Sequence, residues 1–195
     1  ADFKLNDNIT LMGGWGEADL ADDDNNAFWA TMMYQGSNFG LELGYRNIEW
    51  AYIAPGEWDR LGTFYNPRGI EDFKIGFDTN VAGGTGLSVD AYIGSFLDGG
   101  PDYWSAQAEA KMGFGGGWNG ILGAEWVNIE SSGTDARQRW YSLGASKTVG
   151  KDGLFKLLYQ YGDHNFSPFY GMGLRGFSGS DVRGHMLFSQ VTVKF

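Results

Sequence analysis

The last six residues of the chain, QVTVKF at positions 190–195, decide the fold class because they alternate between polar and apolar side chains. A period of two is expected of a β-strand whose two faces meet different surroundings. One face would hold Val191, Val193 and Phe195, and the other Gln190, Thr192 and Lys194. The segment is therefore predicted to be a strand that ends the chain on an aromatic residue.

Nine further segments upstream show the same alternation. In segment 103–114, for example, the even positions from 104 hold only Trp, Ala, Met and Phe, whereas the odd positions 105–111 hold Ser, Gln, Glu and Lys. The sequence therefore predicts an all-β protein. The ten predicted strands are Ile9–Gly16, Ala27–Tyr34, Phe39–Ile48, Ile70–Thr79, Leu87–Phe96, Tyr103–Phe114, Trp118–Ile129, Gln138–Val149, Leu154–Gly162 and Gly184–Phe195.

The connections between these strands are alternately short and long. The short ones all contain Gly, which tolerates the positive φ of hairpin turns. They are 35–38, 81–84, 115–117 and 150–153, and the long ones are 17–26, 49–69, 97–102, 130–137 and 163–183. This order predicts an antiparallel sheet with tight turns at one end and longer loops at the other. Twelve strands would follow if the second or fifth long connection contained a hairpin.

The composition favours a membrane-embedded sheet over a soluble one. Phe, Trp and Tyr make up 16% of the 195 residues and there are 32 Gly, while the mean hydropathy is only −0.31. No apolar run approaches the length of a membrane-spanning helix. The absence of Cys excludes disulfides and thiolate metal sites. The chain begins at Ala1 without a basic or apolar leader, so we expect a mature form whose signal peptide has been removed.

The alternation, the loop asymmetry and the terminal Phe195 together resemble small outer-membrane β-barrel proteins of Gram-negative bacteria. The resemblance implies one domain, residues 1–195, folded as a closed antiparallel transmembrane β-barrel of about ten strands. It also implies periplasmic short turns, extracellular long loops, contact with outer-membrane lipid and lipopolysaccharide, and recognition of Phe195 by the barrel assembly machinery. A soluble β-sandwich or lipocalin-like barrel fits less well, because charges of both signs stand at mid-strand on the polar side.

The polar side of the strands would line the lumen of such a barrel. Its charges are five acids and five bases: Glu42, Asp78, Asp90, Glu109 and Glu125, and Arg46, Lys74, Lys111, Lys156 and Lys194. Ten strands enclose little space, so we expect Arg46, Lys74 and Lys111 to pair with Glu42, Asp78, Asp90 or Glu109. The lumen would then be a polar plug or a narrow channel for passive diffusion of small polar solutes. Porins for acidic oligosaccharides use a ladder of bases, which this sequence lacks.

The fifth long connection is unusually apolar for a surface segment. An exposed patch of this kind favours an interaction site. Its apolar residues are Phe166, Phe169, Tyr170, Met172, Leu174 and Phe177. They would plug the lumen, dock a protein partner, guide an apolar solute or pack on the second long connection, and the sequence leaves these alternatives open.

Several other functions are disfavoured by the sequence. The net charge of −10 opposes binding to nucleic acid. No cofactor is expected, because the G-x-G-x-x-G match at 171–176 has no strand–helix unit around it. No metal site is expected either, because the acidic first connection, 17–26, lacks the glycine and glutamate of a calcium-binding loop.

Catalysis is a further alternative. His164 and His185 lie at either end of the last long connection and are expected to be neighbours, with Asp163 close by. An Asp–His pair that activates water would make an outer-membrane hydrolase. The local patterns of the omptin proteases and the lipid A deacylases are absent, so we predict a protein that is not an enzyme.

Overall fold

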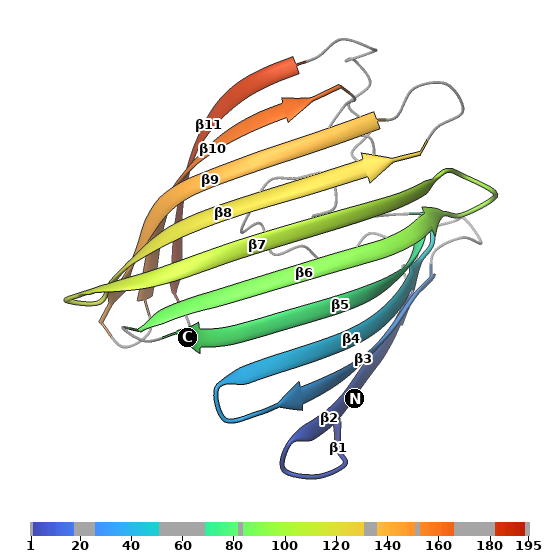
Figure 1. Cartoon of the computed structure of the whole chain (residues 1–195), viewed down its shortest axis with the longest axis horizontal. Coiled ribbons are helices and arrows are strands. Elements are labelled where there is room, and N and C mark those ends of the chain that lie inside the picture. Colours follow the sequence, from blue (N-terminus) through green and yellow to red (C-terminus); the bar gives the residue numbers. More distant parts are fainter. Residues whose placement is uncertain are drawn as a thin grey trace.

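The computed structural model describes residues 2–17, 26–50, 69–81, 84–130, 136–150, 153–165 and 182–193. They form an 11-stranded antiparallel sheet in which each strand pairs with the next along the chain (Figure 1). The strands are β1 (Asp2–Lys4), β2 (Ile9–Glu17), β3 (Asn26–Gln35), β4 (Phe39–Ile48), β5 (Ile70–Val81), β6 (Thr85–Phe96), β7 (Asp102–Gly115), β8 (Trp118–Ile129), β9 (Ala136–Val149), β10 (Gly153–His164) and β11 (Val182–Val193).

All ten predicted strands are present, so the prediction of an antiparallel all-β fold is confirmed. The bounds of β4 and β8 are those predicted, and the other described ends differ by at most two residues. An eleventh strand, β1, was not predicted; it pairs with β2 from Asp2 opposite Met12 to Lys4 opposite Thr10. Positive φ at Gly84, Gly116 and Gly150 shows why the short turns contain glycine.

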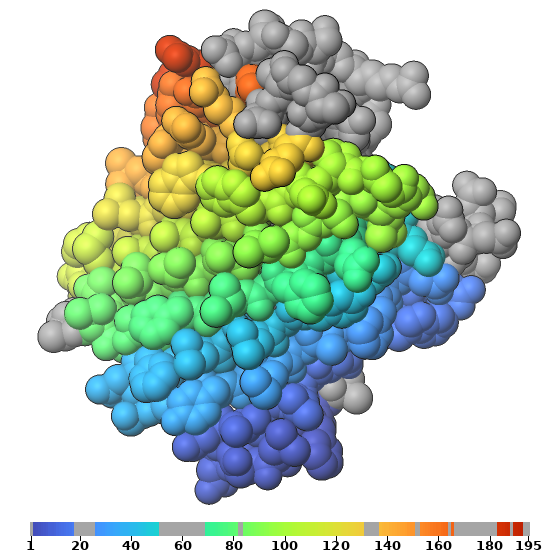
Figure 2. All heavy atoms as spheres, turned by 45° about the vertical axis from the view of Figure 1, so that its right-hand side comes forward, coloured from blue at the N-terminus to red at the C-terminus, as the bar shows by residue number. Residues whose placement is uncertain are grey.

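The strand register divides the sheet into two faces. Residues directly opposite each other in neighbouring strands share a face, and the series Arg46–Asp72–Gly94–Tyr103 runs across β4, β5, β6 and β7. We call the face that carries this series the inner face, and the opposite one the outer face. The sheet is bent and twisted, with its strands side by side in chain order (Figure 1), and the colours of Figure 2 show the same order on one side of the molecule.

Burial on the two faces is inverted relative to a soluble protein. The buried residues of the sheet, Gly120 excepted, lie on the inner face, and many of these are polar, including Asp72, Ser105, Glu125, Gln138 and Gln160. The large exposed apolar side chains of the strands lie on the outer face, with Trp29 and Leu154 as exceptions. Examples are Leu43 at 49%, Ile75 at 58%, Ile93 at 70%, Leu143 at 59% and Leu187 at 71% exposed. Water is a poor solvent for such a face, and lipid is a good one.

Aromatic residues form rows near both ends of the outer face. At the short-turn end, the Phe39 ring lies 5.8 Å from that of Tyr34 and 6.4 Å from that of Phe77. At the long-loop end, the Tyr45 ring lies 5.1 Å from that of Phe73 and 6.2 Å from that of Phe28. Two aromatic rows around an apolar band are typical of strands that cross a bilayer.

The two edges of the sheet are β1–β2 and β11. In the described part of the chain no pairing joins β11 to β1 or β2, so closure of the barrel remains a prediction. The described residues contain no helix that is both long and apolar enough to cross a membrane. Lys194 and Phe195, on which the first argument from sequence depends, lie outside the described residues.

Candidate functional site

The inner face of β4–β7, which we call the charged wall, is organised around a buried aspartate. Asp72 is 0% exposed and accepts hydrogen bonds from Arg46 Nε and Nη2, each 2.7 Å long. The hydroxyl of Tyr103 donates to Asp72 Oδ2 as well. The ring of Tyr92 covers the Arg46 guanidinium at 4.7 Å, a favourable cation–π contact. Asp72 thus fixes one cation and one phenol from two other strands.

A second ion pair lies next along the strands, toward the short-turn end. Lys74 Nζ is 2.7 Å from Glu42 Oε2 and 3.3 Å from Asp90 Oδ1. The other oxygen of Asp90 accepts from Gln107 Nε2 at 2.6 Å. These side chains remain 20–27% exposed, so the pair borders solvent on the inner face. One lysine here joins carboxylates from two neighbouring strands.

The charged wall opens toward the short turns. Lys111 Nζ pairs with Glu109 Oε1 at 2.9 Å, with side chains 62% and 36% exposed. Asp78 is exposed and makes no ion pair with a described residue. The exposure of these charged side chains therefore increases from the buried Arg46–Asp72 pair to the exposed Lys111–Glu109 pair at the short-turn end.

An apolar cluster covers the other end of the same wall. Ile70, Tyr103, Val127 and Ile129 are buried together, with Ile48 and Phe96 packed against them. The Trp50 ring stacks on Phe96 at 6.2 Å. This apolar cluster therefore lies between the Asp72 network and the long-loop end.

The inner face of β8–β10, which we call the neutral wall, has mostly uncharged polar groups. Gln160 is 2% exposed and donates through Nε2 to Ser142 Oγ at 3.1 Å. Its Oε1 has no hydrogen-bond partner among the described residues. The two charged residues of this wall are Glu125, which is buried, and Lys156, which is half-buried, and each has a polar or electrostatic partner. The neutral wall thus offers amide and hydroxyl groups where the charged wall offers ion pairs.

The register places nine of the ten predicted luminal charges on the inner face. They are Glu42, Arg46, Lys74, Asp78, Asp90, Glu109, Lys111, Glu125 and Lys156. The tenth, Lys194, and the apolar loop residues Phe166, Phe169, Tyr170, Met172, Leu174 and Phe177 lie outside the described residues. Lys74 and Lys111 pair with acids of the predicted set.

The predicted partner of Arg46 is wrong. Arg46 pairs with Asp72 rather than with Glu42, Asp78, Asp90 or Glu109, because Asp72 lies directly opposite it in the β4–β5 register. Asp72 was missed although it alternates in phase with Lys74 in a predicted strand. Tyr103 was also missed, because a tyrosine at a strand end does not by itself indicate an inward hydroxyl.

The two histidines of the hydrolase hypothesis do not share a face. His185 lies opposite Tyr161 in the β10–β11 register, whereas His164 lies opposite Val182. Positions 182 and 185 are three residues apart on one strand, so they fall on opposite faces. His185 is on the outer face, with Nδ1 2.5 Å from the Tyr159 hydroxyl. The expectation that the histidines form one neighbouring pair is therefore wrong.

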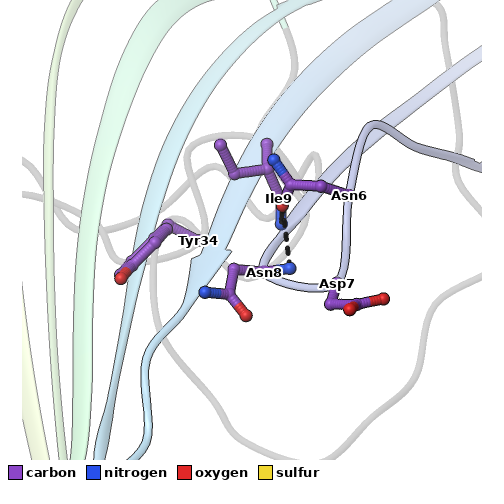
Figure 3. A pocket seen from close by; sticks show the side chains of 5 residues that line it. All are labelled: Asn6, Asp7, Asn8, Ile9 and Tyr34. Atoms are coloured by element: carbon purple, nitrogen blue, oxygen red, sulfur yellow. Dashed lines mark hydrogen bonds between the residues drawn. The ribbon is translucent and has the colours of Figure 1, made fainter.

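A shallow hollow of about 340 Å³ lies beside the β1–β2 turn, lined by Asn6, Asp7, Asn8, Ile9 and Tyr34 (Figure 3). Asn6 Oδ1 accepts hydrogen bonds from the backbone N–H groups of Asn8 and Ile9, each 2.9 Å long, which shapes the turn. Asp7 is the one acid in the lining. The described residues contain no group of three His, Cys, Asp or Glu placed to hold a metal ion.

Comparison with known proteins identifies the fold. No family model and no curated protein sequence matches the chain. Among solved structures, the chain is similar to OmpT, an outer membrane protein of Vibrio cholerae in its trimer form, with a TM-score of 0.66 and 12% sequence identity. The match covers 97% of this chain and 61% of that one, so this chain spans about three fifths of its length. The antiparallel all-β sheet therefore resembles that of an outer-membrane β-barrel, as the sequence predicted.

Proposed function

We propose that the protein is an integral outer-membrane β-barrel whose inner face lines a narrow passage for small polar solutes. The inversion of burial carries this proposal: ionic and amide groups are on the inner face, and large apolar side chains are exposed on the outer face. A closed sheet with these faces would place lipid outside and hydrated polar groups inside. Closure, through β11 and the β1–β2 edge, is part of the proposal.

The chemistry of the inner face supports weak selectivity among small solutes. In the charged wall, Arg46 and Lys74 are each held by carboxylates, so neither sign of charge forms an unopposed ring. The neutral wall adds Ser142 and Gln160, which can replace part of the hydration of a passing polar molecule. The apolar cluster around Ile70 would set the narrowest point.

Conductance of the refolded protein in planar bilayers tests this function. Chemical modification of a cysteine introduced on either face then tests whether the conducting path follows the inner face. The chain has no Cys, so Ser88→Cys on the inner face and Val89→Cys on the outer face form a matched pair on β6. We expect small single-channel steps that a charged methanethiosulfonate reagent lowers in Ser88→Cys and leaves unchanged in Val89→Cys. Absence of conductance in the wild type would contradict the channel and favour a structural or partner-docking barrel.

The proposal also states that the protein is not an enzyme. The placement of His164 and His185 on opposite faces supports this. Hydrolysis of a peptide or lipid A substrate by the wild type, lost in His164→Ala and retained in the outer-face variant His185→Ala, would contradict it.

A further inference from the structure

The outer face of β9–β11 changes chemistry in tiers that run across the three strands. At the long-loop end the register aligns an arginine tier, Arg139, Asp163 and Arg183. Two residues closer to the short-turn end of each strand lies an aromatic tier, which consists of Tyr141, Tyr161 and His185. Next follows an apolar tier, Leu143, Tyr159 and Leu187. The order runs from cationic through aromatic to apolar.

The arginine tier has more positive charge than its one acid balances. Arg139 is exposed and makes no ion pair with a described residue. Arg183 is 66% exposed and its Nε is 3.8 Å from Asp163 Oδ2, at the limit of an ion pair. Arg137 lies on the same face of β9, two residues closer to the loop end, and is half-buried. Both exposed guanidinium groups are therefore available to an anion from outside.

The rings of the aromatic tier lie next to one another across the three strands. The rings of Tyr141 and Tyr161 are 6.4 Å apart and nearly parallel, at 23°. The His185 ring lies 5.2 Å from that of Tyr161 and stacks at 5.8 Å on Tyr159. Trp126 of β8 meets Tyr141 edge-on at 6.4 Å. Amphipathic rings at this position suit the boundary between a polar headgroup and acyl chains.

Near the long-loop ends of the strands, the outer face has the opposite charge elsewhere on the sheet. On β5–β7 the aligned residues are Glu71, Ser95 and Asp102, and Glu71 accepts a hydrogen bond from the Tyr45 hydroxyl at 2.9 Å. Charge is thus segregated along the long-loop end, acidic on β5–β7 and basic on β9–β11. Although the chain has a net charge of −10, the basic patch on β9–β11 would attract an anionic partner.

We propose that the outer face of β9–β11 binds a phosphorylated glycolipid of the outer leaflet. Arg139 and Arg183 hold its phosphate, because guanidinium groups bind phosphate oxygens in a bidentate fashion. The aromatic tier packs against the sugar, and the acyl chains lie on the apolar tier and on Leu157 and Phe155 below it. From Tyr159 to Phe155 this apolar surface extends roughly 13 Å along β10. The inference rests on the proposed outer-membrane location and orientation.

Binding of bisphosphorylated lipid A to the refolded protein in detergent, titrated by native mass spectrometry, tests the site. We expect the Arg139→Gln/Arg183→Gln double variant to bind at least about tenfold more weakly than the wild type, a change of about 1.4 kcal/mol. Dephosphorylated lipid A should bind the wild type equally weakly. Lys147→Gln, on the outer face near the short turns, is the matched control and should bind as the wild type does.

Other outcomes would overturn the site or its occupant. Binding by the double variant within about twofold of the wild type would remove the arginine tier as the site. Equal binding of phosphatidylglycerol, or displacement by equimolar inorganic phosphate, would overturn the assignment to a glycolipid. If the double variant does not fold, the wild type tests the site by itself, through its binding of dephosphorylated compared with bisphosphorylated lipid A. The Arg139→Lys/Arg183→Lys variant should then retain most of the binding of bisphosphorylated lipid A. Conductance is measured separately, so lipid binding without conductance contradicts the channel alone.

Discussion

The charged wall and the neutral wall of the inner face bury polar groups by different means. In the charged wall, Asp72 at 0% exposure is matched by Arg46 and Tyr103. In the neutral wall, Gln160 at 2% exposure has a single 3.1 Å hydrogen bond to Ser142 in the described part of the chain. A buried ion needs a partner far more than a buried amide does.

The two walls should therefore differ in how much each contributes to the stability of the protein. Loss of one partner in the charged wall leaves a buried charge, which costs several kcal/mol. Loss of one amide in the neutral wall leaves one neutral donor or acceptor, which costs much less. The charged wall is therefore expected to fix the shape of the sheet, and the neutral wall to tolerate change.

Asp72→Ala should have the largest effect. It leaves the Arg46 guanidinium and the Tyr103 hydroxyl without their shared acceptor, so the free energy of unfolding should fall by about 3–5 kcal/mol. Urea unfolding in lipid vesicles, followed by tryptophan fluorescence, measures the change. Asp78→Ala is the control, because Asp78 is exposed on the same face of β5. Equal effects of the two substitutions would remove the Asp72 network as the centre of the charged wall.

Gly94→Ala should have the next largest effect. A methyl group at position 94 would lie 2.1 Å from the backbone oxygen of Glu71 and 2.5 Å from Asp72 Cβ, and it would force β5 and β6 apart. Overpacking against backbone should cost about 2–3 kcal/mol. Gly86→Ala, on the same face of β6, would meet only Asn80 Oδ1 at 3.6 Å. In the same unfolding assay, a Gly94 variant as stable as the Gly86 variant would show that β5 and β6 are not in close contact there.

Lys74→Met should have a moderate effect on stability and a larger one on selectivity. Glu42 and Asp90 lose their shared cation, at a cost of about 1–2 kcal/mol because the group is partly exposed. Two unpaired carboxylates would also shift the reversal potential in a KCl gradient toward cation selectivity. Lys111→Met, with 62% exposure at Lys111, should change both quantities less. An unchanged reversal potential in Lys74→Met would place the residue away from the conducting path.

Gln160→Leu should have the smallest effect. Leucine removes one hydrogen bond to Ser142 together with an oxygen that has no partner among the described residues. The free energy of unfolding should therefore change by less than about 1 kcal/mol. Ser142→Ala should behave similarly, and the double variant should cost less than the sum of the two, because both substitutions remove the same hydrogen bond. A loss as large as that in Asp72→Ala would abolish the distinction between the two walls.

The sequence predicts the strands better than their partners. The bounds of β4 and β8 follow from the alternation, because each strand ends at a change of period or at a turn residue. β1 was missed because three residues, Asp2–Lys4, cannot establish a period. The long connection 49–69 leaves the β4–β5 register undetermined by turn geometry, so Arg46 opposite Asp72 could not be read from sequence.

The same limit explains which site residues the sequence supplies. It identifies the face of Glu42, Lys74 and Asp90, because alternation alone assigns a face. It does not identify Tyr103, whose hydroxyl is inward because β7 continues the register of β6 across Gly94. The arginine tier of β9–β11 was not predicted either, because it exists only once three strands are aligned.

The most direct test of the account is lipid contact at adjacent positions of one strand. Ser142→Cys and Leu143→Cys on β9 place a fluorescent bimane on the inner and outer face, respectively. In vesicles of brominated phospholipid, the account predicts strong quenching at position 143 and little at position 142. Aqueous iodide should quench in the opposite order. Equal quenching by bromine at both positions, or stronger quenching at 142, would contradict an outer face in lipid and an inner face in water.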